Sequence, residues 1–216
     1  MPFLLRVELP DVPGSLGRVA TAIGEAGADI EAIEIVEHRP DGTAVDDVLL
    51  ETSPGAMPDS IVSACNALDG VRVVWISRYA AGGNLFLDLE AVEELTAHPS
   101  KALDRLVDLL PITFRADWAA RVRRIDGPGG QDSTKILHAT GAAPGTVGWF
   151  ALERPGRVVQ GADDINVLCA VPLAQVGGGR AEQIVVGRRG GPEFLESELA
   201  RMGHLVALAV SIARQA

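Results

Sequence analysis

The order of apolar and polar residues at the start of the chain predicts a strand that leads into a helix. Over residues 3–9 every second residue, beginning with Phe3, is apolar, so these side chains share one face of an extended segment. Pro10 ends that alternation, and from Leu16 onward the apolar residues recur with helical spacing. Gly27 suits the end of this helix because glycine adopts the left-handed conformation without strain.

The connection between these two elements is the first candidate binding feature. Asp11 is placed to cap the helix, and Pro13 suits its first turn. A helix start presents unpaired backbone N–H groups and a positive dipole end, and Gly14 lets a ligand approach the backbone. The carboxylate of a free amino acid suits such a position. The alternative, that the segment only caps the helix, remains open.

The rest of residues 1–80 predicts three more strands and one more helix. We expect strands at 30–37, 43–51 and 71–76, a turn at 39–42 and a helix at 59–68. The resulting order is strand, helix, strand, strand, helix, strand. This is the order of the ferredoxin-like fold.

Two segments within this order resemble the ACT domain family. They are Leu9-Pro10-Asp11-Val12-Pro13-Gly14-Ser15-Leu16-Gly17-Arg18-Val19 and Gly27-Ala28-Asp29-Ile30. The resemblance covers residues 1–80 and implies that copies pair side by side and bind a small effector, usually an amino acid, near their interface. The ligand contacts that it implies come from the loop before the first helix and from the start of the second strand: Leu9, Asp11, Val12, Gly14, Ser15, Leu16, Asp29 and Ile30.

The chain departs from the family pattern at Asp29, where members whose side chain contacts the ligand often carry Asn. An Asn side chain can donate to a carboxylate, whereas an ionised Asp can only accept. Asp29 and Asp11 are therefore suited to an α-ammonium group, with the carboxylate left to the helix start, or they repel anions from the site. A third interpretation makes Asp29 a solvated carboxylate at a strand edge.

The second half of the chain predicts an α+β domain bounded by helices. Residues 79–84 suit a linker, and helices are expected at 85–95, at 103–110 and from Pro192 almost to the C-terminus. Ser100 and Pro111 are expected to cap and to end the middle helix. Strands are expected at 114–124, 133–139, 146–152, 166–173 and 181–188, with turns at 127–130 and 177–180. The predicted organisation is a ferredoxin-like domain at 1–80, a linker helix region at 81–99, and an antiparallel sheet with flanking N- and C-terminal helices at 100–216.

Three segments of this second domain, residues 103–119, 167–173 and 184–194, resemble the GAF domain family in their order and in the helix that follows them. The resemblance implies a small-molecule sensor or dimerisation module, with a cavity between the sheet and the loops over it. Residues 139–165 are few and rich in Gly and Pro, so we expect this cavity to be small or absent. Cys169 lies in an apolar strand, which does not suit the attachment of a bilin.

Composition limits the kinds of partner and the cellular compartment that we expect for this protein. The formal net charge of −10 argues against a nucleic-acid partner, because such binding depends on Lys and Arg neutralising phosphates. Cys65 and Cys169 have apolar neighbours and are expected to be buried free thiols. No cleavable leader pattern and no apolar run of about 18 residues is found, so we expect a cytoplasmic protein without membrane contact.

Enzyme chemistry finds no support in the residue pattern. The four histidines are scattered, and none is spaced from another ligand in the way that a zinc site requires. Gly14-Ser15-Leu16-Gly17 is not a nucleophile elbow, and Gly177-Gly178-Gly179-Arg180 lacks the ending of a phosphate-binding loop. The adjacent pairs Asp46-Asp47 and Asp163-Asp164 are interpreted as solvated charges near turns. We therefore expect no catalytic residues, no metal and no cofactor.

The leading hypothesis is a regulatory protein whose ACT domain binds an amino acid and whose GAF-like domain dimerises or transmits the signal. No output segment is found in the sequence, so a downstream protein is expected as a further partner. The alternative is a protein-interaction and assembly module without a ligand, which the long, apolar-striped C-terminal helix favours. A small enzyme is the third possibility.

Overall fold

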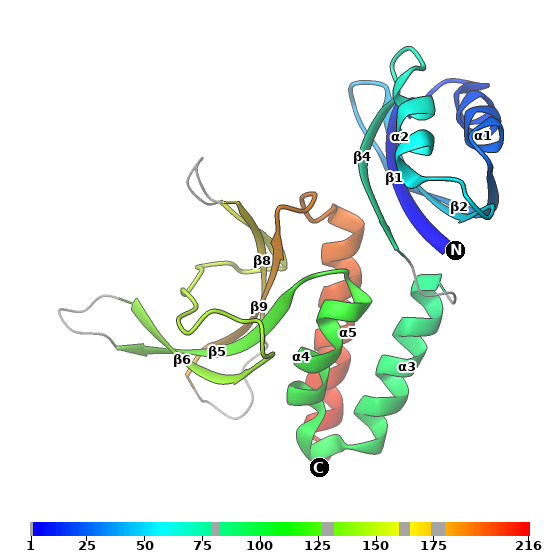
Figure 1. Cartoon of the computed structure of the whole chain (residues 1–216). Coiled ribbons are helices and arrows are strands. Elements are labelled where there is room, and N and C mark those ends of the chain that lie inside the picture. Colours follow the sequence, from blue (N-terminus) through cyan, green and yellow to red (C-terminus); the bar gives the residue numbers. More distant parts are fainter. Residues whose placement is uncertain (1, 79–82, 127–131, 160–164, 174–179) are drawn as a thin grey trace. The chain divides into compact units, whose positions relative to one another are not determined.

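The computed structural model describes residues 2–78, 83–126, 132–159, 165–173 and 180–216 (Figure 1). The chain divides into two compact units, Met1–Ala81 and Gly82–Ala216. Each unit has its own sheet and its own buried apolar core. Within the described residues, no helix combines the length and the apolar composition needed to cross a membrane.

The first unit has the predicted ferredoxin-like order. Its elements are β1 (Pro2–Pro10), α1 (Ser15–Glu25), β2 (Ala28–His38), β3 (Thr43–Thr52), α2 (Pro58–Asn66) and β4 (Arg72–Arg78). The strands form one sheet in the order β2-β3-β1-β4, and all neighbours are antiparallel. The fold class predicted for this half of the chain is confirmed.

The core of the first unit is built from the alternation that predicts β1. The alternating apolar residues of β1, which begin with Phe3 and end with Leu9, lie on the sheet face that α1 and α2 cover and pack against Val19, Ile61 and Cys65. Figure 1 shows both helices on the same side of the sheet. The opposite face carries a buried ion pair: Arg6 Nε lies 2.7 Å from Asp47 Oδ1.

Strand β2 is one of the two edges of this sheet. Its pairing with β3 shifts register twice, between Ile30 and Ala32 and between Ile35 and Glu37. Ile33 and Ile35 are exposed to 36% and 51%. The outer backbone edge of β2 is therefore bordered by exposed apolar side chains, a combination that favours association with another strand.

The start of α1 differs from the prediction. The N-cap residue is Gly14 in the left-handed conformation (φ 91°), and no side chain caps the helix. Pro13 lies in the turn that precedes the helix. Asp11 therefore is not the cap, because its carboxylate is engaged by His38 from a distant strand. Gly27 follows the helix with φ 86°, as predicted.

The second unit is an α+β unit with helices before and after an antiparallel sheet. Its elements are α3 (Gly83–Ala97), the 3₁₀ turn η1 (Pro99–Lys101), α4 (Ala102–Thr113), β5 (Trp118–Asp126), β6 (Asp132–Ala139), β7 (Gly156–Val158), β8 (Asn166–Pro172), β9 (Glu182–Arg189) and α5 (Glu196–Ala213). The sheet order is β6-β5-β9-β8-β7. This arrangement confirms the predicted fold class of the second half.

The two faces of this sheet are covered in different ways. One face packs against α4 and α5, with Phe114, Ile184 and Met202 among the fully buried side chains. On the other face, Trp118 and Leu168 pack beneath residues from the long connection between β6 and β7. Helix α3 packs on α4 and α5 within this unit. The separate linker helix region at 81–99 stays a prediction.

Several local predictions for the second unit are wrong. Ser100 lies in the 3₁₀ turn and does not cap α4, whose N-cap is Lys101. Pro111 does not end α4 but lies inside it, and the helix continues to Thr113. The proline removes one backbone hydrogen bond to the preceding turn without breaking this helix. Residues 114–117 and 146–152 are not strand, and α5 begins at Glu196, after Pro192. The linker residues 79–82, the turn at 127–130 and most of the turn at 177–180 lie outside the described residues.

Candidate functional site

The loop before α1 is the first of two regions to which the predicted ligand contacts belong. Asp11, Val12 and Gly14 are exposed there. Leu9 and Ser15 are buried, and Leu16 packs against the core of the unit. The structure therefore presents only part of the predicted loop set to a ligand, because the other side chains are buried or packed against the core.

A hydrogen bond between two side chains ties this loop to the end of β2. Nδ1 of His38 lies 2.8 Å from Asp11 Oδ2, and both side chains are largely exposed. Because an ionised carboxylate has no proton, His38 is the donor. The backbone N–H of Asp11 also donates to Gly42 O at 2.8 Å. These bonds fix the loop at the end of the sheet where β2 finishes and β3 begins.

Two buried polar groups lie on the elements next to this loop. Among the described residues, Ser15 Oγ and Asp46 Oδ1 are buried without a hydrogen-bond partner. Burial raises the pKa of Asp46; His38 opposes this rise, and the nearby Asp11 and Asp47 carboxylates add to it. The interpretation of Asp46-Asp47 as solvated charge is therefore wrong, because both residues are buried in β3. Asp163-Asp164 lies outside the described residues.

The start of β2 is the second region. Asp29 is exposed and lies directly opposite Glu51 of β3, whereas Ile30 packs against the core. Strand β2 runs from Ala28 to His38, so at about 3.3 Å per residue Asp29 and His38 are about 30 Å apart. One copy of the chain therefore does not bring the two groups of predicted contacts together.

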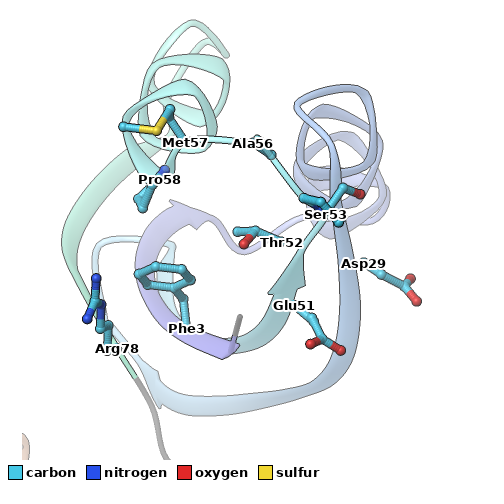
Figure 2. A pocket seen from close by; sticks show the side chains of 11 residues that line it. Phe3, Asp29, Glu51, Thr52, Ser53, Ala56, Met57, Pro58 and Arg78 are labelled. Atoms are coloured by element: carbon cyan, nitrogen blue, oxygen red, sulfur yellow. The ribbon is translucent and has the colours of Figure 1, made fainter.

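A cavity of about 690 Å³ lies at the Asp29 end of the sheet (Figure 2). Its apolar lining comes from Phe3, Pro54, Ala56, Met57 and Pro58. Its charged lining comes from Asp29, Glu51 and Arg78. Its walls belong to the start of β1, the end of β3, the loop that leads into α2, the start of β2 and the end of β4.

The charges of this cavity lie on different strands. Phe3 of β1 is opposite Leu50 of β3 on one side and opposite Arg78 of β4 on the other. Figure 2 shows Arg78 on one side of the Phe3 ring and Glu51 and Asp29 on the other. Because Phe3 is paired with Leu50, the next residue of β3, Glu51, and its partner Asp29 project from the other face of the sheet, and Figure 2 shows both carboxylates pointing away from the cavity.

Sequence reasoning missed Arg78 and Glu51 as candidate contacts. The predicted strand order contained the necessary signal, because in this topology the starts of β1 and β2 and the ends of β3 and β4 share one end of the sheet. Charged residues at those four strand ends could have been grouped before the structure was known.

The second unit contains a cavity of about 540 Å³. It lies between the connection that includes Thr146 and the strand residues Trp118 and Leu168, with Asp117 and Arg189 in its lining. Asp117 Oδ2 accepts a hydrogen bond of 2.6 Å from the Arg189 backbone N–H. The sequence left a small cavity or no cavity as the two expectations for this unit, and the structure has a cavity.

The two cysteines are in the state that the sequence predicts. Cys65 and Cys169 are free and buried, as predicted, and burial raises the pKa of both thiols. Both groups are therefore poor nucleophiles at neutral pH. Among the described residues, no group of three or more His, Cys, Asp or Glu side chains is arranged to hold a metal ion.

Comparison with known proteins identifies the class of the first unit. Residues 3–56 match the family described as ACT domain. NAD-dependent malic enzyme 1 of Bacillus subtilis (strain 168) is 38% identical over 74 residues, which are 34% of this chain. The chain spans 17% of the length of that enzyme. Residues 3–56 therefore form an ACT domain, as the resemblance in the sequence predicts.

Solved structures similar to this chain include GAF domains. The GAF domain of Acinetobacter phosphoenolpyruvate-protein phosphotransferase is 14% identical, with a TM-score of 0.44 over 63% of this chain and 95% of that chain. The GAF domain of a putative sensor histidine kinase from Pseudomonas syringae pv. tomato is 12% identical, with a TM-score of 0.46 over 61% of this chain and 86% of that chain. Free methionine-R-sulfoxide reductase from Neisseria meningitidis, in complex with its substrate, is 14% identical, with a TM-score of 0.46 over 63% of this chain and 95% of that chain.

Proposed function

We propose that this chain is a non-enzymatic regulatory protein whose ACT domain binds an amino acid as its effector. In this proposal the GAF-like second unit dimerises or transmits the signal to a downstream protein. The ACT match at residues 3–56 and the exposed Asp11 and Asp29 support the ligand part. A cytoplasmic location and a homodimer belong to the same proposal.

One observation carries the proposal: the two groups of predicted contacts lie at opposite ends of an exposed edge strand. If two copies pair antiparallel through β2, the start of β2 in one copy lies beside the end of β2 in its partner. Asp29 of each copy then approaches the Asp11 loop of the other. The exposed Ile33 and Ile35 would be covered in such a pair.

The chemistry of the paired site suits a zwitterion. The N-terminus of α1, opened by Gly14, favours the carboxylate of an amino acid. Asp29 from the other copy accepts hydrogen bonds from the α-ammonium group. His38 donates a hydrogen bond to the Asp11 carboxylate, so this carboxylate already has a partner at the site.

Calorimetric titration of the full chain with each of the twenty amino acids tests this function. We expect heat and a rise in melting temperature with a small subset of them. Asp11→Ala should weaken binding at least tenfold, whereas Asp41→Ala, an exposed aspartate in the turn before β3, should leave it unchanged. Absence of binding for every amino acid would remove the ligand claim.

An assembly module without a ligand remains the second candidate. The C-terminal helix does not support it, because its apolar stripe, including Leu199, Met202 and Val206, is buried in the core of its own unit. The specific observation in its favour is the set of exposed apolar side chains on α3 and α4, Phe86, Leu89 and Ile112. A stable oligomer that never responds to amino acids would favour this alternative.

A further inference from the structure

The cavity at the start of β1 lies on the side of the sheet that α1 and α2 cover. Phe3 is paired with Leu50 on one side and with Arg78 on the other, and directly opposite residues share a face of the sheet. Asp29 and Glu51 border the cavity but point away from it (Figure 2). Its volume of about 690 Å³ falls in the range of about 300–1,000 Å³ that is usual for ligand pockets.

The loop that leads into α2 forms a preformed wall of this cavity. The backbone N–H of Ala56 donates to Ser53 O at 3.0 Å, and Gly55 has a φ of 91°. Pro54 and Gly55 thus occupy the positions that proline and glycine favour in a type II turn. The backbone N–H of Ser53 also donates to Gly27 O at 2.9 Å. A ligand does not have to order this wall, which lowers the cost of binding.

The lining combines apolar side chains with a guanidinium group. Phe3, Met57 and Pro58 belong to the apolar part, and Met57 is 61% exposed. Figure 2 shows Arg78 beside the Phe3 ring. Within the described residues, the Arg78 guanidinium has no hydrogen-bond or ion-pair partner. A guanidinium presents a fork of N–H donors that matches a carboxylate, so this side of the cavity favours an anion.

We infer that this cavity binds a carboxylate with an apolar body and no amino group. The carboxylate of the ligand pairs with Arg78, and its apolar body lies on Phe3 and covers the exposed Met57. An α-ammonium group in this cavity would lose water without gaining a carboxylate partner, because the two acidic residues of the lining point away. This site goes beyond the amino-acid site of the proposed function, which uses the Asp11 loop, and it requires residues of one copy only.

Calorimetric titration of the full chain with phenylpropanoate, phenylpropanamide and phenylalanine tests the assignment. The three ligands share one apolar body; the amide removes the charge, and phenylalanine adds an α-ammonium group. We expect phenylpropanoate to bind at least about tenfold more tightly than the amide, because hydrogen bonds between two charged groups are stronger than neutral ones. Phenylalanine should be at least about tenfold less effective than unlabelled phenylpropanoate in displacing a labelled sample of it.

Two variants of the lining test the roles of its residues. Arg78→Gln should weaken phenylpropanoate binding at least about tenfold, and Met57→Glu should do the same by placing a like charge beside the ligand. The matched controls are Arg18→Gln on α1 and Ile112→Glu on α4, both at exposed positions outside the lining, and neither should change binding. Asp11→Ala should weaken amino-acid binding and leave phenylpropanoate binding unchanged.

The outcomes separate this inference from the proposed function. Absence of phenylpropanoate binding, equal binding of the acid and its amide, or binding unchanged by Arg78→Gln overturns the inference and leaves the amino-acid sensor intact. Equal displacement by phenylalanine also overturns it. Selective binding of phenylpropanoate by a chain that binds no amino acid supports the inference and removes the proposed function. The comparison of ligands on the unaltered chain decides the matter even where a variant fails to fold.

Discussion

His38 Nδ1 lies 2.8 Å from the Asp11 carboxylate and holds the loop before α1 against the last residue of β2. Asp29 lies at the other end of the same strand. This relationship divides the predicted ligand contacts into two groups that one copy keeps apart. An amino acid that contacts both groups must therefore bind between two copies of the chain.

The buried Asp46 carboxylate is expected to make stability fall as the pH rises. Because its pKa is raised above the ordinary value of 3.8, the folded state binds the proton more tightly than the unfolded chain. The free energy of unfolding therefore decreases as the pH rises from about 4 through the folded pKa. Asp46→Asn should raise it by roughly 1 kcal/mol at pH 7, with a smaller gain near pH 4.

Urea unfolding at several pH values measures this difference. Asp41→Asn is the control, because hydrogen bonds from Thr43 lower the pKa of the exposed Asp41 and removal of its charge should not stabilise the fold. A gain for Asp46→Asn that is equal at pH 4 and pH 7 would contradict the electrostatic account.

The second unit depends on a buried ion pair at the start of α5. Arg188 Nη2 lies 2.5 Å from Glu198 Oε1, and Glu198 Oε2 accepts a bond of 2.8 Å from the backbone N–H of Leu195. Glu198→Gln leaves the Arg188 charge buried without its counterion and should cost about 3 kcal/mol of the free energy of unfolding. Glu196→Gln, at an exposed position two residues away, should change it by less than about 1 kcal/mol in the same assay.

Close packing between Gly187 and Trp118 should make a single methyl group destabilising. A β-carbon built on Gly187 would lie 2.6 Å from Trp118 Cζ2, closer than non-bonded carbon atoms approach each other. Gly187→Ala should lower the free energy of unfolding by about 1–3 kcal/mol, because the ring must move in a packed core. Gly141→Ala meets no atom within 4 Å and serves as the control in thermal unfolding. Equal melting temperatures for the two variants would refute this packing.

The two thiols should be inert in the folded chain. Cys65 and Cys169 are both fully buried, and Cys169 Sγ lies 3.8 Å from Met202 Sδ in the core of the second unit. A thiol-reactive dye should therefore label neither cysteine in the native protein and both after denaturation. Rapid labelling of either residue under native conditions would show that its surroundings open.

Local periodicity was enough to predict most elements of the fold. The alternation in β1 identified its buried face, and Gly27 marked the end of α1. The role of Asp11 could not be read in this way, because the partner that takes its carboxylate is His38, a residue brought near only by the pairing of β2 and β3. A local sequence pattern does not predict the role of a side chain whose partner comes from a distant segment.

The wrong strand at residues 146–152 has a similar cause. Val147 and Phe150 pack on the sheet, so their apolar character was correctly detected. The backbone there is satisfied by side chains instead of a strand, since Thr134 Oγ1 donates to Val147 O and Gln183 Nε2 donates to Gly148 O. The spacing of apolar residues indicates which side chains are buried. It does not determine whether the backbone pairs with a neighbouring strand.

Native mass spectrometry of the full chain incubated with a mixture of the twenty amino acids tests whether an amino acid binds between paired β2 strands. We expect a dimer that retains amino acid, and we expect Ile35→Lys on the exposed edge of β2 to lose the bound ligand, whereas Ile112→Lys on α4 should retain it. A chain that retains no amino acid, or one that retains it equally in both variants, would contradict binding across paired β2 strands.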